Sequence, residues 1–176
     1  MEIWIIGGLI VVAMVLISTK IKKTAAKAYE PETVETEEFL VRKPEGFLHP
    51  VRRRTEYPFE VYSKLYGADR EARNIWRASA VLRVHDGKAI DRILTDAIKE
   101  ETFTAKDISQ TDLGRECVSR SEKTEDEMEY AVLRRIVENR RLGKTWELQV
   151  TMLRKHEPEY AQRAAEMLAS MDIKGA

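Results

Sequence analysis

The chain has 176 residues, a length typical of one domain, and its 30 Lys and Arg residues balance its 30 Asp and Glu residues. The overall charge therefore does not point to nucleic acid or to anionic substrates. A hydrophobic content of 43%, with only 8 Gly and 5 Pro, excludes a wholly disordered or collagen-like polymer. The single cysteine, Cys117, cannot close an intramolecular disulfide, which is typical of a reducing compartment.

The amino-terminal segment is the most apolar part of the chain. Residues 3–19 contain no charged side chain. As a helix this stretch would extend about 26 Å, close to the roughly 30 Å of a bilayer's hydrocarbon core. We therefore predict a transmembrane anchor with a basic flank over residues 1–23. The side chains predicted to lie in the bilayer are Ile3, Trp4, Ile5, Ile6, Leu9, Ile10, Val11, Val12, Met14, Val15, Leu16 and Ile17.

The charges that flank this segment predict its orientation. Only Glu2 precedes it, whereas four lysines follow, and these are taken to set the topology: Lys20, Lys22, Lys23 and Lys27. The positive-inside rule places the amino terminus outside and the rest of the protein in the cytoplasm. A cleaved signal peptide is the alternative, because Ala26-Lys27-Ala28 has small residues at the cleavage spacing, but a positive n-region is missing. A buried soluble helix is the remaining alternative.

Residues 24–58 are acidic, contain several prolines and show no sustained period, which predicts a tether. A few apolar side chains in and just after this segment have no obvious core of their own. We predict that they contact a partner, and they are Phe39, Phe47, Leu48, Tyr57 and Phe59. The alternative, that they pack back onto the protein's own domain, stays open.

Residues 59–176 are predicted to form a soluble α+β domain, and its first half contains two strands and a helix. Residues 76–84 alternate apolar and polar side chains, and residues 59–66 are a plausible antiparallel partner. A helix continuing through residue 84 is the alternative. After the turn at Asp86-Gly87, apolar residues recur at helical spacing, which predicts an amphipathic helix over 88–100.

The second half begins with a polar stretch, residues 101–121, that we expect to be irregular. Thr124 to Glu127 has the pattern of a capping box and Gly143 that of a helix end, which predicts a helix over 125–142. Alternation then predicts a strand over 145–152, and Pro158 suits the start of a last helix. The predicted fold is thus a single transmembrane helix plus a small α+β domain of order β-β-α-α-β-α; the alternative is an all-α domain.

Two further patterns in the sequence suggest a metal-dependent enzyme and a DNA-binding protein. His85-Asp86 is similar to the His-Asp doublet of metal-dependent phosphohydrolases, with His49 as a candidate upstream ligand, but that site needs the doublet on a helix. Residues 88–152 could form a winged helix-turn-helix, and Arg134, Arg135, Arg140, Arg141 and Lys144 could then bind DNA. The acidic residues that accompany these arginines favour a solvated, salt-bridged surface instead.

By elimination, we expect a non-catalytic role. The sequence predicts a single-pass membrane-anchored accessory or scaffold subunit whose cytoplasmic domain docks on a larger membrane protein complex. Its partners would be the lipid bilayer and other membrane protein subunits, and no cofactor, metal or small-molecule substrate is inferred. The DNA-binding regulator and the phosphohydrolase remain the alternatives.

Overall fold

The computed structural model describes residues 14–20, 22, 26–50, 56–67 and 75–174. Within them the strands are β1 (Glu32–Glu35), β2 (Phe39–Lys43), β3 (Phe59–Tyr62), β4 (Ala78–Asp86), β5 (Thr102–Gln110), β6 (Arg115–Glu125), β7 (Met128–Asn139), β8 (Lys144–Leu153) and β9 (Asp172–Ile173). Residues 14–20, 22 and 26–28 are helical, and after β1 the helices are α2 (Ile90–Ala97), the short 3-10 helix η2 (Arg154–His156) and α3 (Glu157–Ala169).

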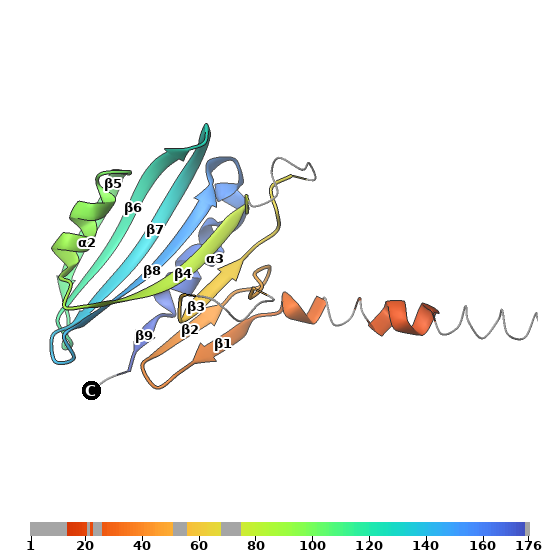
Figure 1. Cartoon of the computed structure of the whole chain (residues 1–176), viewed down its shortest axis with the longest axis horizontal. Coiled ribbons are helices and arrows are strands. Elements are labelled where there is room, and N and C mark those ends of the chain that lie inside the picture. Colours follow the sequence, from red (N-terminus) through yellow and green to blue (C-terminus); the bar gives the residue numbers. More distant parts are fainter. Residues whose placement is uncertain (1–13, 21, 23–25, 51–55, 68–74, 175–176) are drawn as a thin grey trace, which may run out of the picture.

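The strands form two antiparallel sheets. The larger has six strands in the order β3-β4-β8-β7-β6-β5, and the smaller has the order β1-β2-β9 (Figure 1). Of the described residues, 48% lie in strands and 24% in helices, so the predicted α-rich order β-β-α-α-β-α and its all-α alternative are both wrong. Strands that follow one another in the chain are neighbours in the larger sheet, except that β4 pairs with β8 and not with β5.

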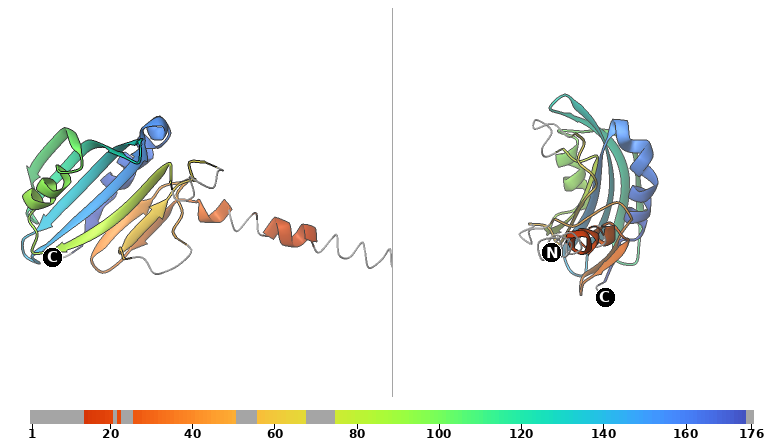
Figure 2. Two further views of the ribbon diagram at one scale, coloured as in Figure 1. Left: turned by 45° about the horizontal axis from the view of Figure 1, so that its top comes forward. Right: turned by 90° about the vertical axis from the view of Figure 1, so that its right-hand side faces the viewer.

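The main core lies between the six-stranded sheet and α3. Trp146, Leu148 and Val150 project from β8 toward this side and are fully buried, together with Tyr160 and Met167 of α3. The segment predicted to be a tether contributes strands β1 and β2 to the same structure. Figure 2 shows α2 and α3 on opposite faces of the larger sheet.

Arg135 of β7 fixes the carboxyl end of α3 on this face. Its Nη1 donates hydrogen bonds to the carbonyl oxygens of Leu168, Ala169 and Met171 at 2.9, 3.1 and 2.8 Å, while its Nε donates to Glu116. The last carbonyls of a helix have no partner within the helix and carry a partial negative charge, so a guanidinium there is stabilising. The arginine thereby holds helix and sheet in one position.

The opposite face is covered only over part of its area. Ile90, Ile93 and Leu94 of α2 pack against Cys117 of β6 and Ile136 of β7 in a second, smaller core. The side chains of β3, β4 and β8 on this side have no such helix over them and are half-exposed for the most part. We call this uncovered half of the sheet the open face.

Several sequence predictions are confirmed element by element. The antiparallel pair predicted over 59–66 and 76–84 is β3 with β4, in which Val61 lies opposite Ala80. The helix predicted over 88–100 is α2, the strand predicted over 145–152 is β8, and the helix predicted from Pro158 is α3. In each case one side of the element is buried and the other is polar, so the spacing of its apolar residues in the sequence indicates the type of secondary structure.

The helix predicted over 125–142 is wrong, because these residues form β7 and the end of β6. β7 is a central strand between the two helices, and apolar side chains therefore point to both of its faces. Adjacent apolar pairs, Val132-Leu133 and Ile136-Val137, then imitate helical spacing. The polar stretch 101–121, expected to be irregular, contains β5 and the start of β6.

The apparent capping box is instead a hairpin turn. Glu125 pairs with Met128, and the two residues between them, Asp126 and Glu127, have positive φ values of 48° and 62°. A two-residue loop with both φ values positive is a type I′ turn, whose usual residues are Asn and Gly. The chain uses two acidic residues there, each in a conformation that costs an ordinary side chain free energy.

Replacing Glu127 by glycine should therefore stabilise the protein. We expect Glu127→Gly to raise the free energy of unfolding by about 1 kcal/mol, because glycine adopts positive φ without steric cost. Urea denaturation measures the change. Glu125→Gly is the matched control, since it removes the same charge from a strand position and should be destabilising; a gain in both variants would attribute the effect to charge alone.

The transmembrane anchor predicted over 1–23 is corrected. No helix within the described residues is long and apolar enough to cross a membrane, so the predicted single-pass membrane location, with the amino terminus outside and the domain cytoplasmic, does not hold. Four of the predicted bilayer residues, Met14, Val15, Leu16 and Ile17, lie in the described helical segment 14–20. The other predicted bilayer residues lie outside the described residues: Ile3, Trp4, Ile5, Ile6, Leu9, Ile10, Val11 and Val12.

The role of four lysines in setting the topology stays a prediction. Lys20, Lys22 and Lys27 lie in helical turns, and Lys23 lies outside the described residues. A different lysine, Lys43 of β2, holds the segment that leads into β1 against the domain. The buried side chain of Lys43 donates hydrogen bonds to the carbonyl oxygens of Ala28 at 2.8 Å and Phe47 at 3.2 Å.

Candidate functional site

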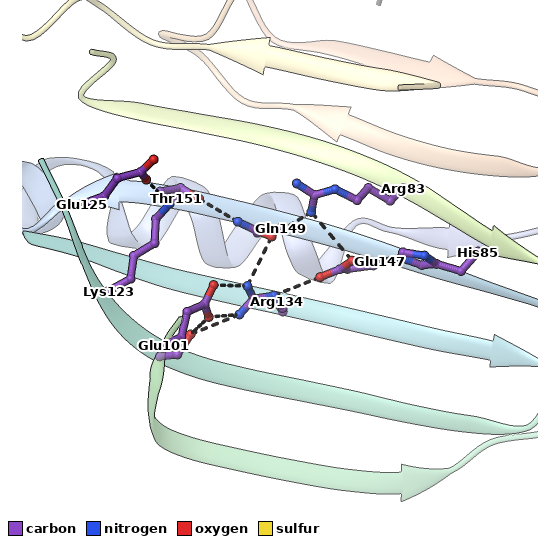
Figure 3. Close-up of polar contacts among 10 residues, drawn as sticks. Arg83, His85, Glu101, Lys123, Glu125, Arg134, Glu147, Gln149 and Thr151 are labelled. Atoms are coloured by element: carbon purple, nitrogen blue, oxygen red, sulfur yellow. Dashed lines mark hydrogen bonds and ion pairs between the residues drawn. The ribbon is translucent and has the colours of Figure 1, made fainter. Parts of the chain in front are cut away.

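A network of charged side chains runs from strand to strand on the side of the sheet that carries the open face, with Arg134 of β7 at its centre (Figure 3). Arg134 is only 4% exposed, and its Nε donates a hydrogen bond to Glu147 of β8 at 3.0 Å. Its two terminal nitrogens bind the carboxylate of Glu101, which follows α2, and also reach Ser121 of β6. One guanidinium thus ties two neighbouring strands and the segment after α2 to β7.

Two side chains of β4 extend the network toward solvent. His85 Nε2 lies 3.0 Å from Glu147 Oε2, and Arg83 Nη1 donates to Gln149 Oε1 at 2.8 Å and lies 3.7 Å from Glu147. Arg83 is 32% exposed and His85 is 19% exposed. Strand register explains this convergence, because Arg83 lies directly opposite Glu147, and His85 lies opposite Thr145, the next residue of β8 on the same face.

The buried carboxylates are held in their charged form. Burial by itself raises the pKa of Glu101, but the hydrogen bonds from Arg134 and Ser121 outweigh it, so the pKa of Glu101 is lowered. Burial likewise opposes ionisation of Glu147, and the hydrogen bond from His85 with the charges of Arg83 and Arg134 lowers its pKa. The pKa of Arg134 is raised by Glu101 and Glu147, against the effect of burial.

Aromatic side chains line the outer part of the open face. Tyr62 of β3, which lies opposite Ser79 of β4, stacks on Trp76 with the ring centroids 4.7 Å apart. The guanidinium of Arg83 lies 5.4 Å from the centre of the Tyr57 ring. Burial and the adjacent Glu60 carboxylate raise the pKa of Tyr62 to about 12, so its hydroxyl stays protonated at neutral pH.

The five predicted contact residues separate into two groups. Phe39, Phe47 and Phe59 are buried in the main core against α3, and Leu48 is half-buried where it pairs with the outer edge of β3. Tyr57 borders the open face through its contact with Arg83, and Leu48 lies directly opposite Tyr62, whose side chain is on this face. The structure therefore brings the three phenylalanines together inside the molecule and not on its surface.

The structure fits neither the metal-dependent phosphohydrolase nor the DNA-binding winged helix. The His85-Asp86 doublet lies at the end of strand β4 and not on a helix, and His49 contacts the carbonyl oxygen of Glu60 instead of His85. Within the described residues, no group of three or more His, Cys, Asp or Glu side chains could hold a metal ion. The winged helix over 88–152 required a helix at 125–142, where the chain forms a β-hairpin.

The central members of the network escaped the sequence analysis. Arg134 was assigned to a basic surface, Glu147 to the polar side of a strand, and Glu101 to an irregular loop. Of these three residues only Arg134 carries a usable signal, since it lies between the apolar residues 131–133 and 136–137, where an unpaired charge would be costly. Glu101 carries no comparable signal.

These observations define a class of small proteins in which a six-stranded antiparallel sheet carries a long helix on one face and a short helix on part of the other. No family model matches the chain, and no curated protein matches it in sequence. Solved structures do share the fold.

One is the Ran-binding protein Mog1p of Saccharomyces cerevisiae, with a TM-score of 0.56 and 9% identity over 83% of this chain and 96% of that one. A second is LpqN of Mycobacterium tuberculosis, described as involved in cell envelope biogenesis, with a TM-score of 0.53 and 11% identity over 83% and 91% of the two chains. A third is cyanobacterial PsbP (CyanoP) of Synechocystis sp. PCC 6803, with a TM-score of 0.51 and 10% identity over 82% and 91%. At such low identity these likenesses show the fold alone.

Proposed function

We propose that this chain is a non-catalytic accessory protein and that the open face of its sheet binds a protein partner. The observation that carries the proposal is the composition of this face, where Tyr57, Tyr62, Trp76 and Arg83 lie half-exposed on neighbouring strands and the segments that lead into them. Tyrosine, tryptophan and arginine are the residues most enriched among those that dominate the binding energy of protein interfaces.

The buried network supports this role by keeping the surface rigid. Arg83 is held by Gln149 and Glu147, and these residues belong to the network that Arg134 anchors from below. A side chain that is already ordered loses less conformational entropy when a partner binds. The description of Mog1p as a Ran-binding protein is consistent with protein binding by this fold.

The charged groups of the network that could act as acids, bases or anion ligands are already paired with one another. His85 is paired with the carboxylate of Glu147, and the donors of Arg134 are taken up by Glu101, Glu147 and neighbouring side chains. The earlier division of the chain at residues 23 and 58, and the assignment of Phe39, Phe47, Leu48 and Phe59 to partner contact, stay predictions.

The proposal predicts that two substitutions on the open face weaken partner binding. A photo-crosslinking residue in place of Thr151 on this face would identify the partner in extracts of the native host, and the affinity of the purified pair would then be measured by calorimetry. We expect Trp76→Ala and Arg83→Ala each to raise the Kd at least tenfold, equivalent to about 1.4 kcal/mol or more.

Leu142→Ala is the matched control, because Leu142 is 47% exposed and lies in the β7–β8 turn, beyond the strand ends. It should leave the Kd unchanged. Far-UV circular dichroism and thermal unfolding of all three variants would establish that they are folded. Equal affinities for the wild type and both open-face variants would contradict the proposed surface, and a crosslinked partner that the chain chemically converts would contradict a non-catalytic role.

A further inference from the structure

The two edges of the six-stranded sheet differ in how they are protected. At one edge, Leu48 exchanges main-chain hydrogen bonds with Tyr62 and so covers part of β3. At the other edge, β5 pairs with β6 and with no other strand of the described chain, and all its residues except Phe103 are exposed. An edge of this length presents a row of main-chain donors and acceptors that can pair with another strand.

The turn after β5 determines which residues face outward. Thr111 and Gly114 exchange main-chain hydrogen bonds, donating to one another at 2.8 and 3.2 Å. In an antiparallel ladder such bonded pairs alternate with unbonded ones, so Ser109 and Asp107 direct their main-chain groups toward β6. The outward-facing groups are therefore those of Lys106, Ile108 and Gln110.

We propose that β5 pairs with β5 of a second copy of this chain, antiparallel, about a two-fold axis at Ile108. A two-fold axis perpendicular to the sheet keeps each side chain on its own face, and residues directly opposite one another share a face. One residue must therefore lie opposite itself. Few residues of β5 can occupy this position on the axis.

Charge and strand geometry favour Ile108 over Ala105, Lys106 and Asp107. An axis at Lys106 or Asp107 would place like charges opposite one another, which is destabilising. Ala105 adjoins the register shift between Phe103 and Ala105, where the ladder is irregular. An axis at Ile108 places this side chain, 39% exposed in one copy, against its own copy and sets Lys106 opposite Gln110.

The helices leave room for this arrangement. In the joined sheet, β6 and its copy would be separated by three strand spacings, about 14 Å. α2 packs over β6 and β7, so the two copies of α2 would lie on the same face at least that far apart. A helix with its side chains is about 10–12 Å across, so both fit without overlap. Because the ladder is irregular near Phe103, only the carboxyl half of β5 can pair with the second copy. So short a contact should give a weak dimer whose population depends on protein concentration.

Proline at position 108 tests the proposal directly. The amide of Ile108 faces outward, so Ile108→Pro removes a donor between copies and leaves the bonds to β6 intact; edge strands tolerate proline in such positions. Sedimentation equilibrium of the full-length chain over a wide concentration range should show a monomer–dimer equilibrium, and Ile108→Pro should weaken it at least tenfold. Ile98→Ala, which removes a 60% exposed apolar side chain outside β5, is the matched control and should leave it unchanged.

A second pair of variants tests the register. Gln110→Glu places a negative charge opposite Lys106 of the other copy and should tighten the dimer, whereas Gln110→Lys should weaken it, more so at low salt. A chain that stays monomeric at every concentration would overturn the proposal, as would a dimer that is indifferent to both Gln110 substitutions and to Ile108→Pro. None of these positions belongs to the open face, so partner binding through Trp76 and Arg83 would succeed or fail independently.

Discussion

The Arg134→Ala variant is expected to lose about 3–5 kcal/mol of its free energy of unfolding. The substitution removes the only guanidinium that hydrogen-bonds both Glu101 and Glu147 among the described side chains, and these two carboxylates are only 7% and 6% exposed. Each would be left buried with fewer partners, and an uncompensated buried charge is far more costly than a lost surface ion pair. Urea denaturation followed by circular dichroism measures the loss.

Arg141→Ala is the control for this substitution, because Arg141 is exposed and a change there should stay within about 0.5 kcal/mol. Arg134→Lys keeps the charge but loses the planar fork that binds a carboxylate through two nitrogens, so it should fall between the two. A loss in Arg134→Ala no larger than that in Arg141→Ala would show that the network does not stabilise the fold.

The free energy of unfolding of Arg134→Ala should also depend on pH differently from that of the wild type. In the wild type the pKa of Glu101 is lower in the folded than in the unfolded state, so its contribution to stability is present above the unfolded pKa and is lost as the pH falls. Without Arg134, burial raises the pKa of Glu101, and protonation then favours the folded state. The difference between variant and wild type should therefore be larger at pH 7 than at pH 4.

The Trp146→Ala variant is expected to lose about 3–5 kcal/mol, from the other side of the sheet. Trp146 of β8 is completely buried between Val84 and Val137 on the neighbouring strands. Its removal would leave a large cavity in the main core, which the surrounding strands can fill only by shifting the ladder. Thermal and urea unfolding of the variant would both measure the effect.

Trp146→Phe separates the packing contribution from the hydrogen-bonding one. The indole Nε1 is buried without a hydrogen-bond partner in the described part of the chain, so replacing it with an apolar ring removes no hydrogen bond. We expect Trp146→Phe to retain most of the stability that Trp146→Ala loses. Equal losses in the two variants would contradict the packing explanation.

The elements that could be predicted from the sequence share one property, which is burial on a single side. In α2, Ile90, Ile93 and Leu94 face the sheet and the intervening residues face water, so the helical period is visible in the residues themselves. β4 alternates in the same way, with Ala78, Ala80 and Leu82 inward. Their local pattern therefore carries the information about their structure.

β7 lacks this property, and its structure depends on what covers it. Because α3 lies on one side and α2 on the other, its apolar residues occupy both faces and its buried arginine occupies a position that would otherwise be apolar. The acidic turn at Asp126 and Glu127 added a second false signal, since acidic residues are also common at the start of a helix. No local pattern distinguishes the two outcomes.

The candidate site was still less accessible to sequence analysis. Arg134 and Glu101 are 33 residues apart, and Arg83 and Gln149 are 66 apart, yet each pair is joined by a hydrogen bond. Such contacts arise from the order of the strands, in which β8 lies between β4 and β7. A position in a single sequence does not reveal which strand will be its neighbour.

By itself, the amino-acid sequence determined helices α2 and α3, the strands that are buried on one side, and the balance of charge that argues against nucleic acid. The tertiary structure alone decided the antiparallel order of the sheets, the burial of the three phenylalanines, and the joining of Arg134 to Glu101 and Glu147. The physical reason is the range of the interactions: amphipathic periodicity is set by neighbours within a few residues, whereas strand pairing and buried ion pairs are set by segments brought together only when the chain folds.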